Sequence, residues 1–279
     1  MQDIHQMVWD GGLNIQIEVD QSLVFGSDEY KPCYINVRLP RESYFPLYLR
    51  SLLYRIKSDL KKDIDEVVPY IWFEQNDANL PWNIPIGTLY DIMNPYVAGI
   101  PLDETSLGSS IQVWKIKMRY GDNPPPNHIP LLNGLDQIQK YWMHQWKQAC
   151  FVLNGSSKQV MSLKTDDSKA FWRSVLTRDG HMFSLTSHKI IPTTPRNIPI
   201  MVHHQTDADY LSQPLVVPHN ESWETTSIQT VIDSSGFVTS NKGALVVVSQ
   251  GIDIPTNMLI EELYKDFVSF DGFLHIVIH

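Results

Sequence analysis

Two proline-rich segments constrain the fold of this chain more than any other feature. The first is Gly121-Asp-Asn-Pro-Pro-Pro-Asn-His-Ile-Pro130, and the second is Ile191-Pro-Thr-Thr-Pro-Arg-Asn-Ile-Pro199. Because proline lacks a backbone N–H and has a fixed φ, neither segment continues a helix or a strand. They divide the 279 residues into three parts, a length that suits two or three compact domains.

The first part, residues 1–121, places strands around single helices. Alternating apolar residues predict strands at 13–19, 33–39, 70–74 and 111–118. Apolar residues at three- and four-residue spacing predict a helix over 42–60 and a shorter one over 86–93. The order is strand, strand, helix, strand, short helix, strand.

The third part, residues 196–279, repeats that order. Strands are predicted at 198–203, 211–217, 245–249 and 273–278, with helices at 225–232 and 256–265. This is the order of the β-grasp fold of ubiquitin. The middle part, residues 131–190, has helical spacing throughout. We therefore predict an α+β chain in which two ubiquitin-like β-grasp domains, 1–121 and 196–279, flank a helix-rich domain, 131–190.

Composition excludes several classes of protein. The longest apolar stretches are far shorter than the ~20 residues that span a bilayer, and the N-terminus has no secretory pattern. Two cysteines are too few for a disulfide framework or a four-cysteine zinc site. The net charge of −9 argues against nucleic-acid binding. However, residues 130–190 carry eight basic and four acidic residues, a local charge of +4. We expect a cytoplasmic protein with a basic middle.

No motif indicates an enzyme, a metal site or a cofactor. The sequence contains no glycine-rich phosphate loop, Gly-x-Ser-x-Gly or His-Glu-x-x-His. Cys150 with His144 is the one candidate pair for a cysteine hydrolase. Six helical residues place their side chains about 120° apart, so a buried structural cysteine is the favoured interpretation. His203, His204 and His219 are interpreted as ordinary histidines, because adjacent strand residues point to opposite faces.

The apolar loop Leu80-Pro-Trp-Asn-Ile-Pro-Ile-Gly87 is a candidate binding edge. Its prolines hold it extended, and a loop with unpaired backbone groups is difficult to bury inside its own domain. Trp82, Pro85 and Ile86 are therefore candidate contacts for a binding partner. The alternative is a plug between two domains.

The helix predicted over 135–153 has two distinct faces. Its inward line consists of Leu135, Ile138, Trp142, Trp146, Ala149 and Leu153, and Gly155 follows as a stop signal. The opposite face displays Lys147 with Met143, His144 and Phe151 around it. An exposed phenylalanine beside a charge is typical of an interface. The alternative is an ordinary surface lysine.

The central segment Tyr141-Trp-Met-His-Gln-Trp-Lys-Gln-Ala-Cys-Phe-Val-Leu-Asn-Gly-Ser-Ser-Lys158 resembles the fungal form of the autophagy-related protein 5 family. Further matching motifs are Arg38-Leu-Pro-Arg-Glu-Ser-Tyr44, Trp72-Phe-Glu74 with Pro81-Trp82 and Pro85-Ile-Gly87, Phe171-Trp172, Pro195-Arg-Asn-Ile-Pro199 and Ser269-Phe-Asp-Gly-Phe-Leu274. The resemblance extends over nearly the whole chain. It implies two ubiquitin-like domains around a helix-rich domain.

By this resemblance, Lys147 is the acceptor that takes the C-terminal glycine of the ubiquitin-like autophagy protein 12 in an isopeptide bond. The conjugate is expected to bind the N-terminal helix of autophagy protein 16, with Trp82, Pro85 and Ile86 as the candidate contacts for that helix. Together they are expected to promote transfer of autophagy protein 8 to phosphatidylethanolamine at the preautophagosomal membrane. The resemblance implies no catalytic site in this chain, since the conjugating enzyme of the pathway holds the thioester.

The basic middle is a candidate membrane contact. Lys158, Lys169 and Arg173 follow the acceptor helix and are predicted to face anionic lipid. The alternative is a solvated helical surface. Two other functions remain open at this level: an adaptor that binds partners without using Lys147, and a cysteine hydrolase centred on Cys150.

Overall fold

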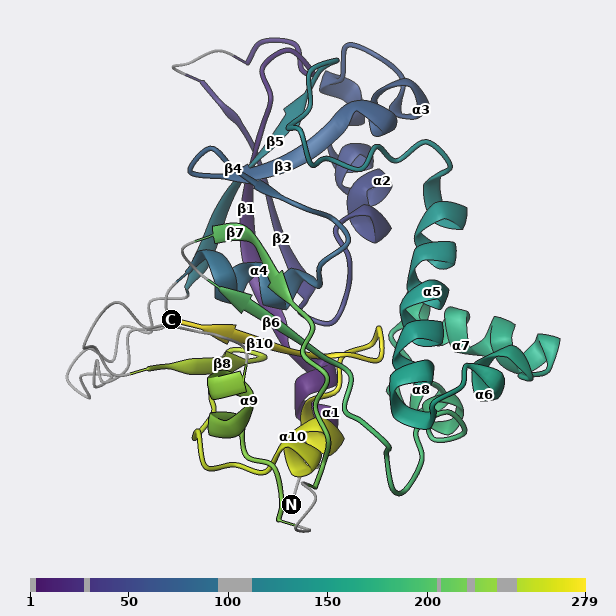
Figure 1. Cartoon of the computed structure of the whole chain (residues 1–279). Coiled ribbons are helices and arrows are strands. Elements are labelled where there is room, and N and C mark those ends of the chain that lie inside the picture. The colour runs from purple at the N-terminus through teal and green to yellow at the C-terminus, as the bar shows by residue number, and fades with distance from the viewer. Residues whose placement is uncertain (1–3, 28–30, 95–111, 205–206, 220–223, 235–244) are drawn as a thin grey trace. The chain divides into compact units, whose positions relative to one another are not determined.

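The computed structural model describes residues 4–27, 31–94, 112–204, 207–219, 224–234 and 245–279. Within them the chain forms two five-stranded sheets and several helices (Figure 1). The described residues fall into two compact units. The first unit comprises residues 11–93 and 112–138, and the second comprises residues 4–10 and 139–279.

The first unit is a β-grasp domain. Its sheet has the strand order β2-β1-β5-β3-β4, in which β1 and β5 are parallel and the other neighbours antiparallel. The strands are β1 Gly12–Val19, β2 Cys33–Pro40, β3 Ile71–Gln75, β4 Ala78–Leu80 and β5 Val113–Tyr120. The helices are α2 Pro46–Arg55, α3 Ile64–Val67 and α4 Ile86–Met93, with short 3₁₀ turns at Lys57–Asp59 and Val68–Tyr70.

Two details of this domain differ from the prediction. The helix predicted over 42–60 is shorter, because α2 begins at Pro46 and ends at Arg55. Proline is well suited to this first helical position, where no N–H is needed. The sequence analysis also missed β4. Asn76 and Asp77, with φ of 50° and 64°, form the tight turn that pairs β3 with β4.

The second unit contains the other β-grasp sheet, with the strand order β7-β6-β10-β8-β9. β6 and β10 are parallel in its centre, as β1 and β5 are in the first sheet. The strands are β6 Ile200–His204, β7 Asp207–Ser212, β8 Val247–Ser249, β9 Ile252–Asp253 and β10 Leu274–Ile278. The helices of this domain are α9 Ile228–Ser234 and α10 Ile260–Phe267.

Two predicted boundaries are shifted in this domain. The strand predicted over 211–217 is β7, which ends at Ser212. Of the remaining predicted residues, 213–217, Val216 forms an isolated bridge with Ile198. The helix predicted over 256–265 begins only at Ile260. A bridge between Leu259 and Ser227 holds residue 259 extended, which delays the start of the helix.

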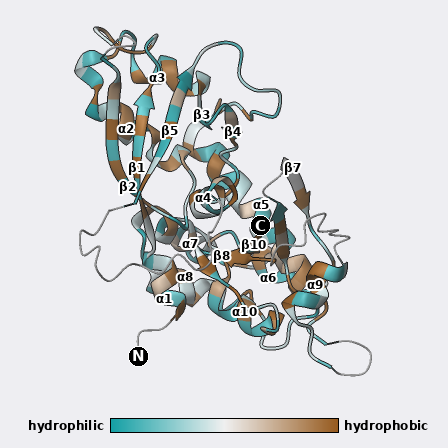
Figure 2. Ribbon diagram, turned by 90° about the vertical axis from the view of Figure 1, so that its left-hand side faces the viewer, coloured by the Kyte–Doolittle hydropathy of each residue, from teal (hydrophilic) through white to brown (hydrophobic). Residues whose placement is uncertain are grey.

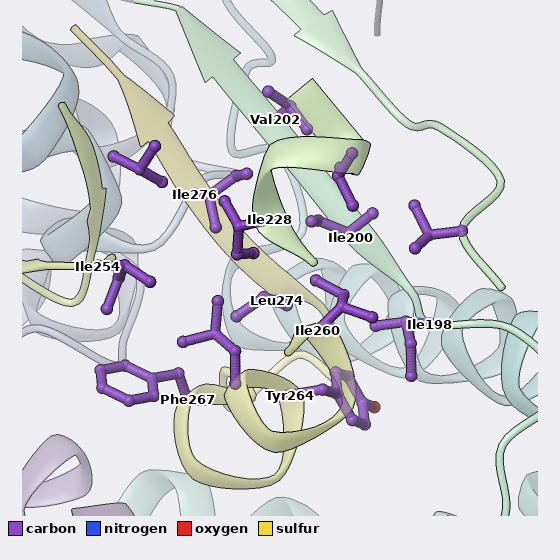
Figure 3. Close-up of a cluster of buried hydrophobic side chains, with 14 of the residues drawn as sticks. Ile198, Ile200, Val202, Ile228, Ile254, Ile260, Tyr264, Phe267, Leu274 and Ile276 are labelled. Atoms are coloured by element: carbon purple, nitrogen blue, oxygen red, sulfur yellow. The ribbon is translucent and has the colours of Figure 1, made fainter. Parts of the chain in front are cut away.

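The core of this domain lies between its sheet and the helices α9 and α10. Apolar side chains from β6 and β10 point toward those from the two helices (Figure 3). In Figure 2 both hydrophobic and hydrophilic colours are visible on α9 and α10, as expected for amphipathic helices. Val8 and Leu153, which lie outside the β-grasp domain in sequence, belong to the same cluster.

The helix-rich part consists of α5 Gly134–Asn154, α6 Lys158–Met161, α7 Thr165–Thr177 and α8 Gly180–Ser187. The N-terminal helix α1, Ile4–Asp10, packs in this second unit, although the prediction placed it in the first domain. The Trp9 ring lies 4.2 Å from the Arg178 guanidinium and 4.6 Å from the Phe183 ring centroid. Its indole N–H also donates to the Arg178 carbonyl. This contact joins positions 169 residues apart, so no local pattern predicts it.

Candidate functional site

The helix α5 is fixed by its aromatic inner face. Trp142 and Trp146 are fully buried, and both indole N–H groups donate to the Phe270 carbonyl, at 2.7 and 2.9 Å. Their rings also pack around Phe171, at centroid distances of 4.8 and 5.1 Å. The predicted inward line is confirmed except at Leu135, which is 48% exposed because it lies in the first helical turn, ahead of the aromatic cluster. The helix is therefore a rigid support for its outer face.

The end of α5 is also as predicted. Gly155 has φ of +71°, and its N–H donates to the Phe151 carbonyl at 2.7 Å. The Leu153 carbonyl accepts a hydrogen bond from the Arg196 N–H at 2.7 Å, so the segment that leads into β6 is bonded to the end of the helix. This capping brings residues 198–200 beside α5, which the sequence pattern did not indicate.

The outer face of α5 presents the residues that surround the predicted acceptor. His144 is exposed, Met143 and Lys147 are half-buried, and the Phe151 side chain is 60% exposed. His144 precedes Lys147 by three residues and Phe151 follows it by four, so all three lie on one face of the helix. The structure thus brings this group together.

A groove of about 490 Å³ contains three of these residues, and it lies entirely within the second unit. His144, Lys147 and Phe151 form its helical wall, with Gln148, Val152 and Ser157 beside them; its remaining lining consists of Ile198, Pro199, Ile200, Gln213, Pro214, Leu215 and Phe273. Met143 is not part of the lining. The sequence pattern does not indicate the second set, since these residues lie 51 or more positions after the lysine.

The groove contains few charged or titratable groups. Among the described residues, the Lys147 amine has no hydrogen bond, ion pair or ring contact. The groove lining contains no aspartate or glutamate, and His144 is the only other titratable side chain in it. The amine is therefore available to a molecule that enters the groove.

The apolar loop of the first unit does not present its side chains. Trp82, Pro85 and Ile86 are all buried, with exposures of 6% for Trp82 and 0% for Ile86. The Trp82 indole N–H donates to the Ile129 carbonyl at 2.7 Å and its ring contacts Tyr44, both in the same unit. The expectation that these residues are accessible to a partner helix is wrong, because the loop folds into its own domain.

The three predicted membrane residues are exposed. Lys158 begins α6, and Lys169 and Arg173 lie one turn apart on α7. Lys169 and Arg173 line a surface hollow that also contains Asp166 and Asp179. The two carboxylates therefore partly neutralise the positive potential of Lys169 and Arg173.

The structure does not present Cys150 as an accessible nucleophile for a hydrolase. Cys150 is fully buried, with its Sγ 3.4 Å from the Ser156 carbonyl oxygen and 3.5 Å from Gln159 Oε1, whereas His144 is exposed on the outer face. Within the described ranges, no group of three or more histidine, cysteine or acidic residues is arranged to hold a metal ion. No described helix is long and apolar enough to cross a membrane.

The second β-grasp domain also contains a buried chain of polar side chains that the sequence pattern does not predict. His203 Nε2 lies 3.0 Å from His275 Nδ1, and His275 Nε2 lies 3.1 Å from Asp271 Oδ2. All three residues are at most 3% exposed. The sequence pattern predicts His203 to be an ordinary histidine. The one sequence feature that points to its partner, His275, is the presence of a histidine within the apolar strand β10.

Comparisons with known proteins agree with this architecture. Three family models match in succession: "Autophagy protein ATG5, UblA domain" over residues 8–120, its "alpha-helical bundle region" over 135–193, and its "UblB domain" over 197–278. Autophagy protein 5 of Vanderwaltozyma polyspora is 38% identical, over 100% of this chain and 96% of its own length. The Candida glabrata protein of that name is 36% identical, over 99% of both chains.

A solved structure gives the same result at the level of the fold. The crystal structure of Kluyveromyces marxianus Atg5 covers 100% of both chains, with a TM-score of 0.81 and 30% sequence identity. The two ubiquitin-like domains around a helical bundle are thereby confirmed, as is the resemblance seen in the sequence. The chain belongs to the autophagy protein 5 family, and its role is in autophagy.

Proposed function

We propose that Lys147 is the conjugation acceptor, which takes the C-terminal glycine of the ubiquitin-like autophagy protein 12 in an isopeptide bond. The observation that supports this role is the amine itself, unpaired among the described residues and set in a groove on an immobile helix. Family membership and the sequence match around Lys147 support the same assignment.

The reaction needs a donor thioester held by the conjugating enzyme of the pathway. The Lys147 nitrogen attacks the thioester carbonyl carbon, the C–N bond forms, the C–S bond breaks, and the proton lost by the amine leaves with the enzyme thiol. The attacking amine must be neutral, and at pH 7 an unperturbed lysine is neutral only about once in 2,500. Since no carboxylate lines the groove, we propose that the conjugating enzyme supplies most of the deprotonation.

The conjugate is proposed to bind the N-terminal helix of autophagy protein 16 and to act with it as a ligase-like complex. That complex promotes transfer of autophagy protein 8 to phosphatidylethanolamine at the preautophagosomal membrane. This chain contributes the acceptor and the scaffold rather than a catalytic site. The buried loop at Trp82 is excluded from the proposed helix contact.

The test is a denaturing gel of the wild type beside Lys147→Arg, each expressed with the conjugation machinery. We expect a heavier band that survives boiling and reductant in the wild type only, with a branched peptide at Lys147 by mass spectrometry. Arginine keeps the charge but cannot form the isopeptide bond. A band that persists in the variant would assign the reaction to another lysine. If the heavier band is absent from both lanes, a non-covalent adaptor becomes the favoured function.

His144 is the one local group in the groove that accepts a proton, so it is tested separately. We expect His144→Ala to conjugate within about twofold of the wild-type rate, because the enzyme supplies the base. A loss of about 10²-fold or more, the range of general-base effects, would place the base in this chain instead.

We also propose that Lys158, Lys169 and Arg173 contact anionic lipid when the complex is recruited. All three are exposed on α6 and α7. At ~1 kcal/mol for each basic residue near such a surface, they contribute only ~3 kcal/mol together. That corresponds to binding weaker than about millimolar, so membrane attachment depends on the partners as well.

A further inference from the structure

The first β-grasp sheet has a long and regular edge strand. β2 is the outermost strand, and it pairs with β1 in an unbroken antiparallel register over eight residues (Figure 1). The other edges of the two described sheets are less regular: β4 has three residues, β9 has two, and the pairing of β7 shifts in register between His203 and His204. Short strands and bulges protect an edge from further pairing, and β2 has neither.

The backbone groups of alternate β2 residues point away from the sheet. The β1–β2 ladder continues at Arg41, whose N–H donates to the Gly11 carbonyl at 3.0 Å, so the odd-numbered residues of β2 bond to β1. The N–H and C=O groups of Tyr34, Asn36 and Arg38 are therefore directed outward. Among the described residues, no group donates to or accepts from the three outward N–H groups.

Arg55 covers the middle of this edge. It is the last residue of α2, and its Nη1 donates to the outward-facing Asn36 carbonyl at 3.1 Å. The Arg55 side chain is exposed, so this hydrogen bond is open to exchange with an incoming N–H group. The bond satisfies the carbonyl in the absence of a neighbouring strand.

Two arginines flank the edge on opposite faces of the sheet. Arg38 is exposed on the open face, together with Tyr34, which is 47% exposed. Arg55 comes from α2, which packs on the other face, where Phe45 at the start of the helix contacts Trp114 of β5. A strand added beside β2 therefore meets one positive group on each of its faces.

The two ends of the edge differ in charge. Burial, and then the Asp59 carboxylate, raise the pKa of Cys33 at the start of β2, which shows that Asp59 lies near this end. Glu18 is the partner of Tyr34 in the β1–β2 register and adds a second carboxylate there. Negative charge on an occupant is therefore favoured beside Arg38 and Arg55 and disfavoured beside the start of the strand.

We propose that β2 is a docking edge for an extended acidic segment of another protein, which adds to the first sheet as a further strand. An N–H of that segment takes over the Asn36 carbonyl, and the released Arg55 guanidinium pairs with a carboxylate of the segment. A neighbouring carboxylate pairs with Arg38, because successive side chains of a strand point to opposite faces. Main-chain hydrogen bonds supply the affinity and the two arginines supply the specificity. This docking does not depend on Lys147.

A second copy of this chain is a less suitable occupant. Pairing β2 with β2 would bring the same basic side chains of both copies, Arg38 and Arg55, to one interface. Like charges at such an interface are unfavourable, and neither copy offers the two neighbouring carboxylates there.

The test uses the outward direction of the Asn36 N–H. Asn36→Pro removes this donor and leaves the hydrogen bonds to β1 in place, and an edge strand tolerates proline where the N–H faces solvent. Asn36→Ala is the matched control, since both variants lose the side-chain hydrogen bond from Gln16 Nε2 but only the alanine variant keeps the N–H. Denaturant unfolding of both variants verifies that the first domain is folded.

The probe is a displayed library of random peptides of about ten residues, which is long enough to pair along β2. Peptides selected on the full wild-type chain are synthesised and their Kd values are measured. We expect them to carry neighbouring acidic residues, to bind Asn36→Pro at least about tenfold more weakly, and to bind Asn36→Ala within about twofold of the wild type. Arg38→Glu and Arg55→Glu should each weaken binding at least about tenfold. Lys164→Glu, the same type of charge reversal at an exposed residue of the second unit, should have no effect.

The inference is overturned if the selected peptides bind Asn36→Pro as tightly as the wild type, or if they carry no acidic residues. It is also overturned if the selection yields no peptide whose binding depends on Arg55. Self-association of the wild type that Asn36→Pro abolishes would assign the edge to a second copy of the chain instead. If Asn36→Pro does not fold, the two arginine reversals decide the result, because both change exposed side chains only.

Discussion

At the scale of single residues, Gly272 shows how closely the second β-grasp domain meets α5. Its φ is +90°, and a Cβ there would lie 3.0 Å from the Ala149 Cβ and 3.1 Å from the Trp146 ring. Its carbonyl accepts the Tyr264 hydroxyl at 3.0 Å. The adjacent Phe273 is part of the lining around Lys147, so this turn supports both the helix and the groove.

We expect Gly272→Ala to destabilise the second unit by roughly 2–4 kcal/mol. About 1–2 kcal/mol comes from the left-handed backbone and the rest from overpacking against α5. Gly26→Ala is the control, since its φ is +67° but nothing lies within 4 Å of the added Cβ. It should cost about 1–2 kcal/mol. Denaturant unfolding of both variants measures the difference, and equal losses would show that the turn relaxes away from the helix.

At the scale of elements, the central strands β6 and β10 are joined by a buried hydrogen-bonded chain. His275 lies between the other two residues, with its Nε2 3.1 Å from Asp271 Oδ2 and its Nδ1 3.0 Å from His203 Nε2. Burial, and then the neighbouring His275, hold the pKa of His203 well below its usual 6.5.

This arrangement predicts acid sensitivity. Below about pH 6.5 the unfolded chain protonates His203 and the folded chain does not, so stability falls as pH decreases toward the lower pKa of the folded state. The slope is about 1.4 kcal/mol per pH unit for one such proton. Tyr264 on α10 is also buried, and burial raises its pKa well above its usual 10, so it does not titrate in that range.

The measurement is the free energy of unfolding of the second unit at pH 7.5, 6.5 and 5.5, for the wild type and His203→Asn. The variant removes the titrating group. We therefore expect the slope of its unfolding free energy against pH to be smaller than that of the wild type by about 1.4 kcal/mol per pH unit below pH 6.5. Its absolute stability will be lower at pH 7.5. Parallel pH profiles for the two proteins would show that His203 is protonated equally in both states.

At the scale of the whole molecule, the charge distribution opposes membrane attachment. The chain carries −9 overall, and its positive middle contains carboxylates next to Lys169 and Arg173. Attraction to anionic lipid is therefore local, weak and sensitive to salt.

Vesicle flotation of the complex with the partners bound tests that contact. We expect reversal of Lys158, Lys169 and Arg173 to glutamate to reduce recovery on vesicles with anionic lipid several-fold, and wild-type recovery to fall between 50 and about 300 mM salt. The control reverses Arg38, Lys57 and Lys115, exposed basic residues of the first unit, with the same change in net charge. Equal recovery of the two triple variants would show that only net charge matters.

Features that depend on nearby residues follow from the amino-acid pattern alone. Prolines at the two joints divide the chain into its three parts, because their effect on the backbone is local. Apolar alternation and the 3.6-residue period predicted most strands and the two faces of α5, since each follows from neighbours along the chain. The motif around Lys147 identified the family, and the burial of Trp142 and Trp146 followed from spacing alone.

Features that join distant positions depend on how the elements pack in three dimensions. Trp82 is buried by Tyr44 and Ile129, α1 packs against the turn at Arg178, and Leu215 lines the same groove as Lys147. Each of these contacts joins residues some 40 to 170 positions apart, which no local period encodes. The physical reason is that burial depends on which surfaces meet after the elements have formed. A sequence pattern reports only which side of an element is apolar.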